Sequence, residues 1–265
     1  MVDINAALIK KLRECTGVGI MECKKALIEA NGNINLAIEN MRKSNAIKAL
    51  KKVNNVAING IIRVNIFDDH GVILEINCET DFVTQNICFL NFTDKLINAL
   101  KVNPTIDLIN LRTQFEEDRI ALVAQLGENI QINRLGILKG NTLSLYLHRN
   151  RIGVLVSGLN IDKLLLKNIA MHIAASKPLF IKPDNIPENI LIKEREIQMA
   201  IAVKSSKSLA IAKQIVEGRM GKFINSISLT GQVFVIDPSK TVSQILREQN
   251  ADIIEFIRFE VGEQT

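Results

Sequence analysis

The sequence predicts an α+β protein made of several small units, and three observations support this fold class. A helical segment at the N-terminus gives way to alternating hydrophobic periodicity after the connector that follows it. A plan of two strands followed by a helix then occurs twice, which indicates a duplicated core with antiparallel sheets. Two further helical segments interrupt the second copy, and they predict an inserted antiparallel helical hairpin.

Length and composition are typical of a folded chain with more than one unit. The chain has 265 residues, of which 47% are hydrophobic, and can bury a substantial core. No apolar run approaches the roughly 20 residues of a membrane span, and the N-terminus lacks a secretory signal pattern, so we expect a cytoplasmic location and no membrane partner. The four cysteines form no C-x-x-C pair, which fits free thiols in a reducing compartment.

Residues 1–54 are expected to form an N-terminal module of three helices followed by a basic connector. The helices carry apolar residues at helical spacing, namely Ile4, Leu8 and Leu12, then Cys23, Leu27 and Ala30, then Leu36, Ile38 and Met41. Turns at Thr16–Gly19 and Asn31–Asn33 separate them, and Gly32 suits the left-handed conformation that closes a helix. Arg42–Asn55 has no clear apolar pattern, so we interpret it as a solvated connector.

Residues 55–140 are expected to form one core subdomain, and residues 141–179 together with 226–265 a second. Each subdomain begins with two alternating strands joined by a tight turn and continues into a helix. The predicted elements are the hairpin Gly60–Cys78 with its turn at Asp68–Gly71, the helix Val83–Leu100, the hairpin Asn141–Leu159 with its turn at His148–Arg151, and the helix Asp162–Ser176. The strand Glu255–Glu263 would complete the second sheet.

Residues 180–225 are expected to form an inserted coiled-coil hairpin. Three prolines within Lys177–Pro187 exclude a regular helix and mark a joint. Helical periodicity resumes over Glu188–Val203 and Ser208–Phe223, and the polar Lys204–Ser208 is the expected turn. The expected apolar stripes are Ile190, Ile197 and Ile201 on the first helix and Ile211, Ile215 and Met220 on the second. A projecting arm with a partner surface and a pair folded back on the sheet are equally compatible with this pattern.

We expect no enzyme activity, no metal centre and no cofactor. The sequence has no metalloprotease, serine-esterase, P-loop or dinucleotide-binding motif. We interpret His172 as a packed helix residue and His70 as a turn residue, whereas His148 lies in a turn where a solvated role and a contact role are both open. Alternation places Cys78 on the apolar face of its strand, where a buried thiol is unreactive.

A basic RNA- or ribosome-associated structural protein is the main alternative class. The net charge of +5 permits it, and phosphate contacts through residues 42–52 are open. The sequence contains no Trp and one Tyr, whereas proteins that bind single strands stack the bases on aromatic side chains. We therefore expect no direct contact with nucleic acid.

A strand exit at Thr80, Asp81 and Phe82 raises a specific question. A Phe at the end of a strand usually turns inward, and one that points outward would have something to bind. From the residues alone, capping of the next helix by Thr80 and Asp81 is the simpler interpretation. A binding role for Phe82 is the alternative.

Five blocks of sequence follow one another in order across nearly the whole chain. They are "LRECTGVGIMECKKALIEANGNINLAIENMRKS", "NCETDFV", "HIAASKP", "VEGRM" and "FIRFEVGE". Together they resemble the bacterial translation elongation factor Ts family. The resemblance implies a guanine nucleotide exchange factor that binds the GTPase elongation factor Tu in its GDP-bound and nucleotide-free forms. It also implies that the N-terminal module is similar to ubiquitin-associated domains.

Candidate site residues follow from this resemblance. Thr80, Asp81, Phe82 and Val83 match the family signature, which implies that they dislodge Mg²⁺ from the GTPase by wedging Phe82 beside the nucleotide. The implied partner contacts are Arg13, Ile20 and Met21 in the N-terminal module, His148 at a hairpin tip, and Val235 and Ile236 in the second subdomain. Whether the helical hairpin also forms a homodimer is left open.

Overall fold

The structure, a computed structural model, describes residues 5–205 and 208–263 and confirms the α+β class. The chain divides into two compact units. The first comprises the described residues up to Arg63 with Leu74–Gly136 and the chain from Glu260 onward, and the second comprises Val64–Ile73 with Ile137–Phe259. The subdomain boundaries expected from the sequence stay predictions.

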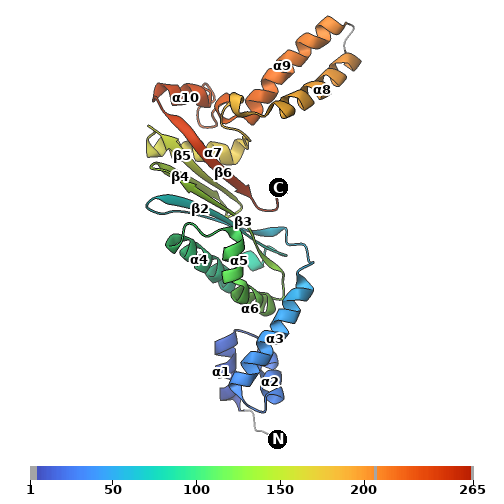
Figure 1. The fold of residues 1–265 in the computed structure, drawn as a ribbon, viewed down its shortest axis with the longest axis vertical. Helices are drawn as coiled ribbons and strands as arrows, with labels where there is room; N and C mark the ends of the chain where they lie inside the picture. The colour runs from blue at the N-terminus through green and yellow to red at the C-terminus, as the bar shows by residue number, and fades with distance from the viewer. Residues whose placement is uncertain (1–4, 206–207, 264–265) are drawn as a thin grey trace. The chain divides into compact units, whose positions relative to one another are not determined.

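Two three-stranded antiparallel sheets organise the chain (Figure 1). The first half contains α1 (Ala6–Thr16), α2 (Ile20–Glu29), α3 (Ile34–Lys52), β1 (Asn59–Ile66), β2 (His70–Cys78), α4 (Ile87–Val102), α5 (Leu108–Gln114), α6 (Glu116–Leu126) and β3 (Ile130–Lys139). The second half contains β4 (Leu143–His148), β5 (Ile152–Leu159), α7 (Lys163–Ser176), α8 (Glu188–Ser205), α9 (Leu209–Ile227), α10 (Val242–Glu248) and β6 (Asp252–Glu260). The strand orders are β1-β2-β3 and β4-β5-β6, so β2 and β5 are central.

The N-terminal module has the predicted three helices and glycine turns. Gly17 closes α1 in the left-handed conformation, with φ of 66°, and Gly32 follows α2 with φ of 80°. The core of the module is made of small and medium apolar side chains, namely Leu12, Val18, Cys23, Ala26, Leu27, Ala30, Ala37 and Met41. Ile4, which was expected in the first apolar stripe, lies outside the described residues.

The expected connector after the third helix is wrong, because α3 continues to Lys52. Its second half buries Asn45 and Ala49, which follow Met41 at intervals of one helical turn. An Asn and an Ala give no clear hydrophobic signal, and the larger apolar residues of this part of the helix, Ile47 and Leu50, are exposed. The helical period is set by burial against other parts of the unit.

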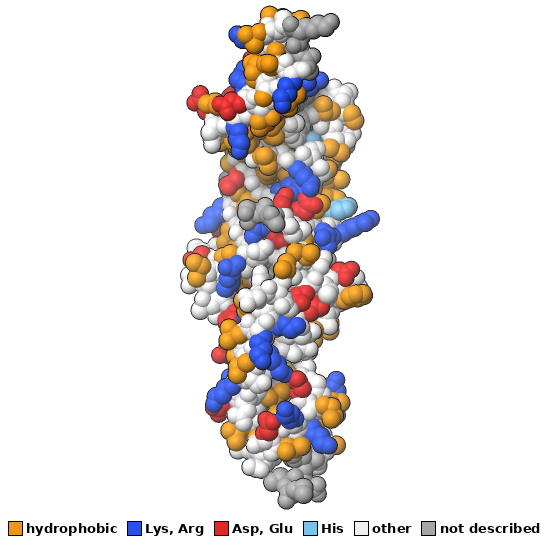
Figure 2. All heavy atoms as spheres, turned by 90° about the vertical axis from the view of Figure 1, so that its right-hand side faces the viewer, with side chains coloured by type: hydrophobic (Ala, Val, Ile, Leu, Met, Phe, Trp, Pro, Cys, Tyr) orange, Lys and Arg blue, Asp and Glu red, His pale blue; other side chains and the backbone are white. Residues whose placement is uncertain are grey.

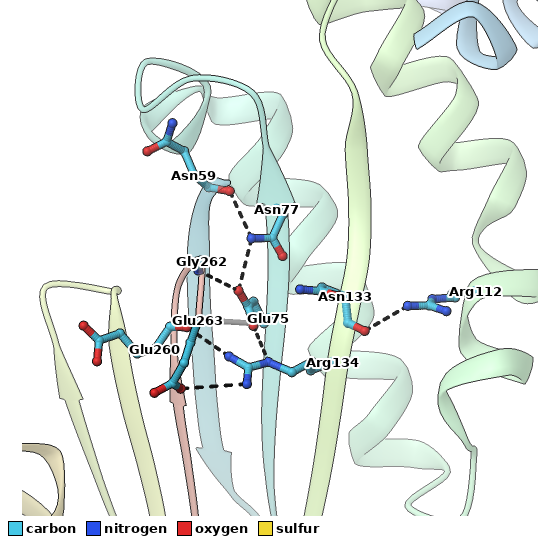
Figure 3. A network of polar contacts seen from close by, with 9 residues as sticks. All are labelled: Asn59, Glu75, Asn77, Arg112, Asn133, Arg134, Glu260, Gly262 and Glu263. Carbon is cyan, nitrogen blue, oxygen red and sulfur yellow. Dashed lines mark hydrogen bonds and ion pairs between the residues drawn. The ribbon is translucent and has the colours of Figure 1, made fainter. Parts of the chain in front are cut away.

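Strand β2 is buried on both faces, and its polar residues are held by a network of contacts (Figure 3). The fully buried Glu75 forms an ion pair with Arg134 of β3, with 2.5 Å between Oε2 and Nε. Glu75 Oε1 also accepts hydrogen bonds from Asn77 Nδ2 at 3.1 Å and from the backbone N–H of Gly262 at 3.3 Å. Arg134 Nη2 donates to the carbonyl of Glu260 at 2.9 Å, so the residues that end β6 are bonded to β2 and β3.

Several elements were not predicted, namely α5, α6, β3 and α10. Strand β3 begins with buried Ile130 and Ile132, but Arg134 then interrupts the apolar alternation. The buried Glu75 on the neighbouring strand neutralises this arginine, and Glu263 lies 3.9 Å from it, so its charge is compensated inside the strand. A contact partner 59 residues away gives no local signal in the sequence.

The second sheet and its helix follow the prediction closely. Strands β4 and β5 pair antiparallel with His148 opposite Ile152, and Arg149 and Asn150 form the turn with φ of 50° and 57°. Two consecutive positive φ values define the type I′ turn that matches the twist of a two-stranded hairpin. The side chain of Asp162 caps α7 by accepting from the N–H groups of Leu164 and Leu165.

Helices α8 and α9 lie side by side as an antiparallel hairpin (Figure 1). Their shared core consists of Ala202, Ala212, Val216 and Met220, with Leu191, Met199, Ile215 and Phe223 packed against it. This cluster is separate from the core of the sheet, which favours a projecting arm over a pair folded back on the strands. The expected stripe is partly wrong, because Ile197, Ile201 and Ile211 are exposed. The turn expected at Lys204–Ser208 includes residues 206–207, which lie outside the described residues.

None of the helices in the described ranges combines the length and the apolar character that crossing a bilayer requires.

Candidate partner-binding site

The strand exit after β2 presents Phe82 to solvent. Phe82 is 83% exposed, while the next residue, Val83, is buried. A single 3₁₀ turn, Val83–Gln85, follows, and Asn86 then returns to extended backbone before α4 begins. A large aromatic ring is therefore held outside the fold by a short segment with one anchored apolar neighbour.

Thr80 is fixed by Glu128, which lies between α6 and β3. The backbone N–H of Thr80 donates to Glu128 Oε2 at 2.9 Å, and its hydroxyl donates to Oε1 at 2.6 Å. Both oxygens of one carboxylate are thus used by one residue of the exposed segment. Hydrogen bonds to an ionised acceptor are about twice as strong as neutral ones.

The expectation that Thr80 and Asp81 cap the next helix is wrong. Asn86 caps α4, because its Oδ1 accepts from the N–H of Cys88 at 2.8 Å. The carbonyl of Asp81 accepts from the N–H and the hydroxyl of Thr84, which closes the turn. Within the described part of the chain, the Asp81 carboxylate has no hydrogen bond or ion pair and is exposed to solvent.

Glu79 fixes the same segment from its other side. Its Oε1 accepts from the backbone N–H of Asn129 at 2.6 Å and from Asn55 Nδ2 at 2.9 Å. The bond from Asn129 lowers the pKa of Glu79 below its ordinary value of 4.5, and the Asn55 bond adds to this effect. Asn129 in turn donates from Nδ2 to the carbonyl of Asn55 at 2.9 Å.

Cys78 is buried, as predicted. Its Sγ donates to the carbonyl of Thr80 at 3.1 Å. Burial, together with the carboxylates of Glu128, Asp81 and Glu79, raises the pKa of the Cys78 thiol to about 12. A thiol with this pKa is protonated at neutral pH and is a poor nucleophile.

In the N-terminal module, the three predicted contact residues flank the first turn. Arg13 lies in the last turn of α1, and Ile20 and Met21 begin α2. All three are exposed, with 75% of Met21 accessible to solvent. The turn between them is fixed from inside by Val18, which is buried in the core of the module.

His148 is exposed at the tip of the hairpin between β4 and β5. Its Nδ1 lies 3.1 Å from the hydroxyl of Tyr146, and the two rings stack with centroids 6.2 Å apart. Tyr146 was not singled out from the sequence. Residues two apart on a strand lie on the same face, so the alternating pattern could have predicted that Tyr146 and His148 are neighbours.

Val235 and Ile236 form an exposed apolar pair after the buried Phe234. The N–H of Val235 donates to His172 Nδ1 at 3.2 Å, and His172 Nε2 lies 2.8 Å from Gln232 Oε1. Since Nδ1 is an acceptor, the proton is on Nε2, which donates to Gln232. His172 is therefore a packed helix residue, as expected, and it also holds the segment that presents Val235.

His70 differs from the prediction, because it begins β2 and is buried. Its ring packs on Phe67 with centroids 5.1 Å apart, and its Nδ1 lies 2.6 Å from the Asp69 carboxylate. Neither Phe67 nor Asp69 is a candidate site residue.

The exposed candidate residues fall into four groups, whereas Thr80 is half-buried and Val83 is buried. The strand exit and the α1–α2 turn belong to the first unit, and the hairpin tip and Val235–Ile236 belong to the second. Aromatic residues, Met and Arg are enriched in protein interfaces relative to the rest of the surface, and Phe82, Met21 and Arg13 are of these types. The geometry therefore favours binding to another protein over acid–base or nucleophilic chemistry.

Comparison with known proteins gives the class of this chain and then its family. The family model described as Elongation factor TS matches residues 79–263. Proteins named Elongation factor Ts from Cronobacter sakazakii and Erwinia tasmaniensis are each 56% identical over 263 residues, and one from Escherichia coli is 54% identical. Each alignment covers 99% of this chain and 93% of the relative. The chain is thus a translation elongation factor. It belongs to the elongation factor Ts family, as the resemblance in its sequence implied.

Proposed function

We propose that this chain is the guanine nucleotide exchange factor of the translation GTPase elongation factor Tu. Membership of the elongation factor Ts family supports the role. The observation that carries it is the exposed Phe82, which stands outside the fold in the segment that matches the family signature. Thr80 and Val83 hold the two sides of that segment, and Asp81 and Phe82 lie between them.

The proposed step is mechanical displacement of the metal that holds the nucleotide. A GTPase of this kind retains GDP through backbone N–H groups at a helix N-terminus and through Mg²⁺. Because Mg²⁺ demands near-ideal octahedral oxygen geometry, a small shift of its ligands strongly weakens the binding of the ion. Phe82, entering a packing site beside the nucleotide, would supply that shift. The free Asp81 carboxylate would accept hydrogen bonds from the partner's backbone.

The remaining exposed groups supply affinity for the GTPase. Arg13, Ile20 and Met21 form one contact, His148 a second, and Val235 with Ile236 a third. If they bind the nucleotide-free GTPase more tightly than the GDP-bound form, GDP binding is weakened by the same factor, because coupling free energy is reciprocal. The chain then accelerates release without changing a covalent bond, so it is not an enzyme with a chemical reaction of its own.

Release of a fluorescent GDP analogue from purified elongation factor Tu tests the proposal. We expect the chain, at catalytic amounts and with excess unlabelled GDP, to increase the release rate. The effect should persist at moderate salt, and added GDP should dissolve the complex between the two proteins. A release rate that does not change at any concentration of the chain would contradict the proposed function.

The same preparation tests the alternative of an RNA-associated structural protein. On the face drawn in Figure 2, Lys and Arg side chains are interspersed with Asp and Glu side chains. Phosphate binding would appear as affinity for RNA that falls steeply with salt. An RNA complex of this kind, without any effect on GDP release, would favour the alternative.

Self-association through the helical hairpin is a separate proposal about partners. Ile197 and Ile201 of α8 and Ile211 of α9 are exposed apolar side chains that such a homodimer would cover. Light scattering of the purified chain over a concentration series distinguishes monomer from dimer. A monomer at all concentrations would remove this proposal and leave the exchange function intact.

A further inference from the structure

The exposed segment that carries Phe82 is held by a reciprocal pair of carboxylate contacts. Glu79 accepts from the backbone N–H of Asn129, and Glu128 accepts from the backbone N–H of Thr80. Two neighbouring residues of one segment thus bond two neighbouring residues of the other, each through one carboxylate. We call Glu79, Thr80, Glu128 and Asn129 the carboxylate clasp.

The second half of the clasp is itself fixed at both ends. Gly127 ends α6 in the left-handed conformation, with φ of 75°, and its N–H donates to the carbonyl of Val123 at 2.8 Å. Ile130, which is fully buried, begins β3 directly after Asn129. Glu128 therefore lies in a short connection between the end of a helix and the start of a strand, and both of these elements are packed in the first unit.

The clasp leaves little freedom to the residues that meet the partner. Thr80 is bonded on the N-terminal side through both its N–H and its hydroxyl, and Val83 is buried on the C-terminal side. Asp81 and Phe82 are the two residues between these anchors. Ordering a side chain and its loop on binding costs free energy, so a wedge that is already ordered acts more effectively.

We infer that Glu128 is a positioning residue for nucleotide exchange, because its carboxylate fixes Thr80 and so sets the direction in which Phe82 leaves the fold. The inference rests on the proposed exchange function and adds a residue that acts only through Phe82. Glutamine at this position has no charge: its oxygen can accept from one donor of Thr80, and its NH₂ group can meet Thr80 only if the hydroxyl turns to accept. Both contacts would then be neutral hydrogen bonds, which are about half as strong as bonds to a carboxylate.

Four variants test the inference: Glu128→Gln, Phe82→Ala, their combination, and the control Glu117→Gln. Glu117 lies on α6, is exposed, and has no hydrogen bond or ion pair among the described residues, so its variant makes the same charge change nearby. The readouts are the maximal rate of GDP release, the concentration of the chain that gives half of this rate, and the thermal melt.

We expect Glu128→Gln to lower the maximal rate about three- to tenfold, the range set by the cost of ordering one side chain and its loop. The half-maximal concentration should change little, since the other contact groups are untouched. In the Phe82→Ala background the same change should have no further effect, because the Phe82 ring that Glu128 positions is already absent. Glu117→Gln should behave like the unmodified chain in all three readouts.

An equal loss from Glu128→Gln with and without Phe82 would overturn the inference, and so would an unchanged rate. Thr80→Val provides a milder version that removes only the hydroxyl bond and leaves the charge of Glu128 in place. It should lower the rate in the same direction, and it decides the question if Glu128→Gln lowers the melting temperature. A chain without any effect on GDP release would instead contradict the proposed function itself.

Discussion

Replacement of Phe82 by alanine separates a wedge from a core residue. The perturbation removes the ring and leaves the backbone, the clasp around Thr80 and the turn closed by Thr84 in place. Because Phe82 is 83% exposed, about a sixth of the residue is in contact with the fold. This contrasts with a buried Phe, whose truncation costs about 3–5 kcal/mol of folding stability.

The expected loss of stability follows from the small buried area. A fully buried Phe covers roughly 150–250 Å², so a sixth of it is roughly 25–40 Å². At about 25 cal/mol per Å², the lost burial amounts to about 1 kcal/mol at most. For a domain of this size the melting temperature should fall by no more than about 4 °C.

The expected loss of exchange is larger. An aromatic residue at the centre of an interface contributes about 2 kcal/mol or more when truncated. At 1.4 kcal/mol per tenfold, this is a decrease of about 30-fold in the rate of GDP release. The complex with elongation factor Tu should still form, because the other three contact groups remain.

Stopped-flow release of a fluorescent GDP analogue, paired with a thermal melt, measures both effects. Ile87→Ala is the matched control, since Ile87 is a nearby residue that is 66% exposed and lies outside the proposed wedge. It should leave both measurements near those of the unmodified chain. An unchanged release rate together with a collapsed melting temperature for Phe82→Ala would refute the wedge and show that Phe82 stabilises the fold.

Three further predictions concern one exposed contact residue, His148, and two buried residues, Glu75 and His172. His148→Ala should weaken the complex modestly and leave the thermal transition unchanged, because His148 is exposed; titration calorimetry and a melt check this, and a large loss of stability would mean a structural role. Glu75→Ala should lower the free energy of unfolding in urea by about 3–5 kcal/mol, because it removes the fully buried carboxylate that pairs with the mostly buried Arg134 at 2.5 Å, whereas Glu263 lies farther, at 3.9 Å; a loss below about 1 kcal/mol would show that other groups replace Glu75. Burial lowers the pKa of His172 in the folded protein below 6.5. The stability that neutral His172 contributes is therefore present above pH 6.5 and is lost as the pH falls through the pKa of the folded protein. A His172 pKa at or above 6.5, measured by NMR titration, would contradict this.

Much of the fold was predictable because its signals are local. The glycine turns of the N-terminal module, the tight turn after His148 and the cap of α7 by Asp162 each depend on residues a few positions apart. Hydrophobic periodicity likewise placed α7, α8 and α9. The helical continuation of α3 over Asn45 and Ala49 was missed, since its buried face carries no apolar pattern.

The residues of the candidate site could be predicted from the sequence, but the contacts that hold them in place could not. The segment Thr80–Val83 could be singled out from its sequence, yet its residues alone favoured helix capping. The structure instead shows Asn86 in the capping role and Thr80 bonded to Glu128. Glu128 gave no signal, because a glutamate after a helix-ending glycine is ordinary in a solvated turn.

The sequence by itself determined the fold class and the family of this chain. These follow from short-range patterns and from matched blocks of residues. Tertiary structure decided that Glu75 meets Arg134, that Glu128 meets Thr80, and that Phe82 stands in solvent. The two pairs are 59 and 48 residues apart, and long-range pairing depends on how the strands and helices pack and not on local propensity.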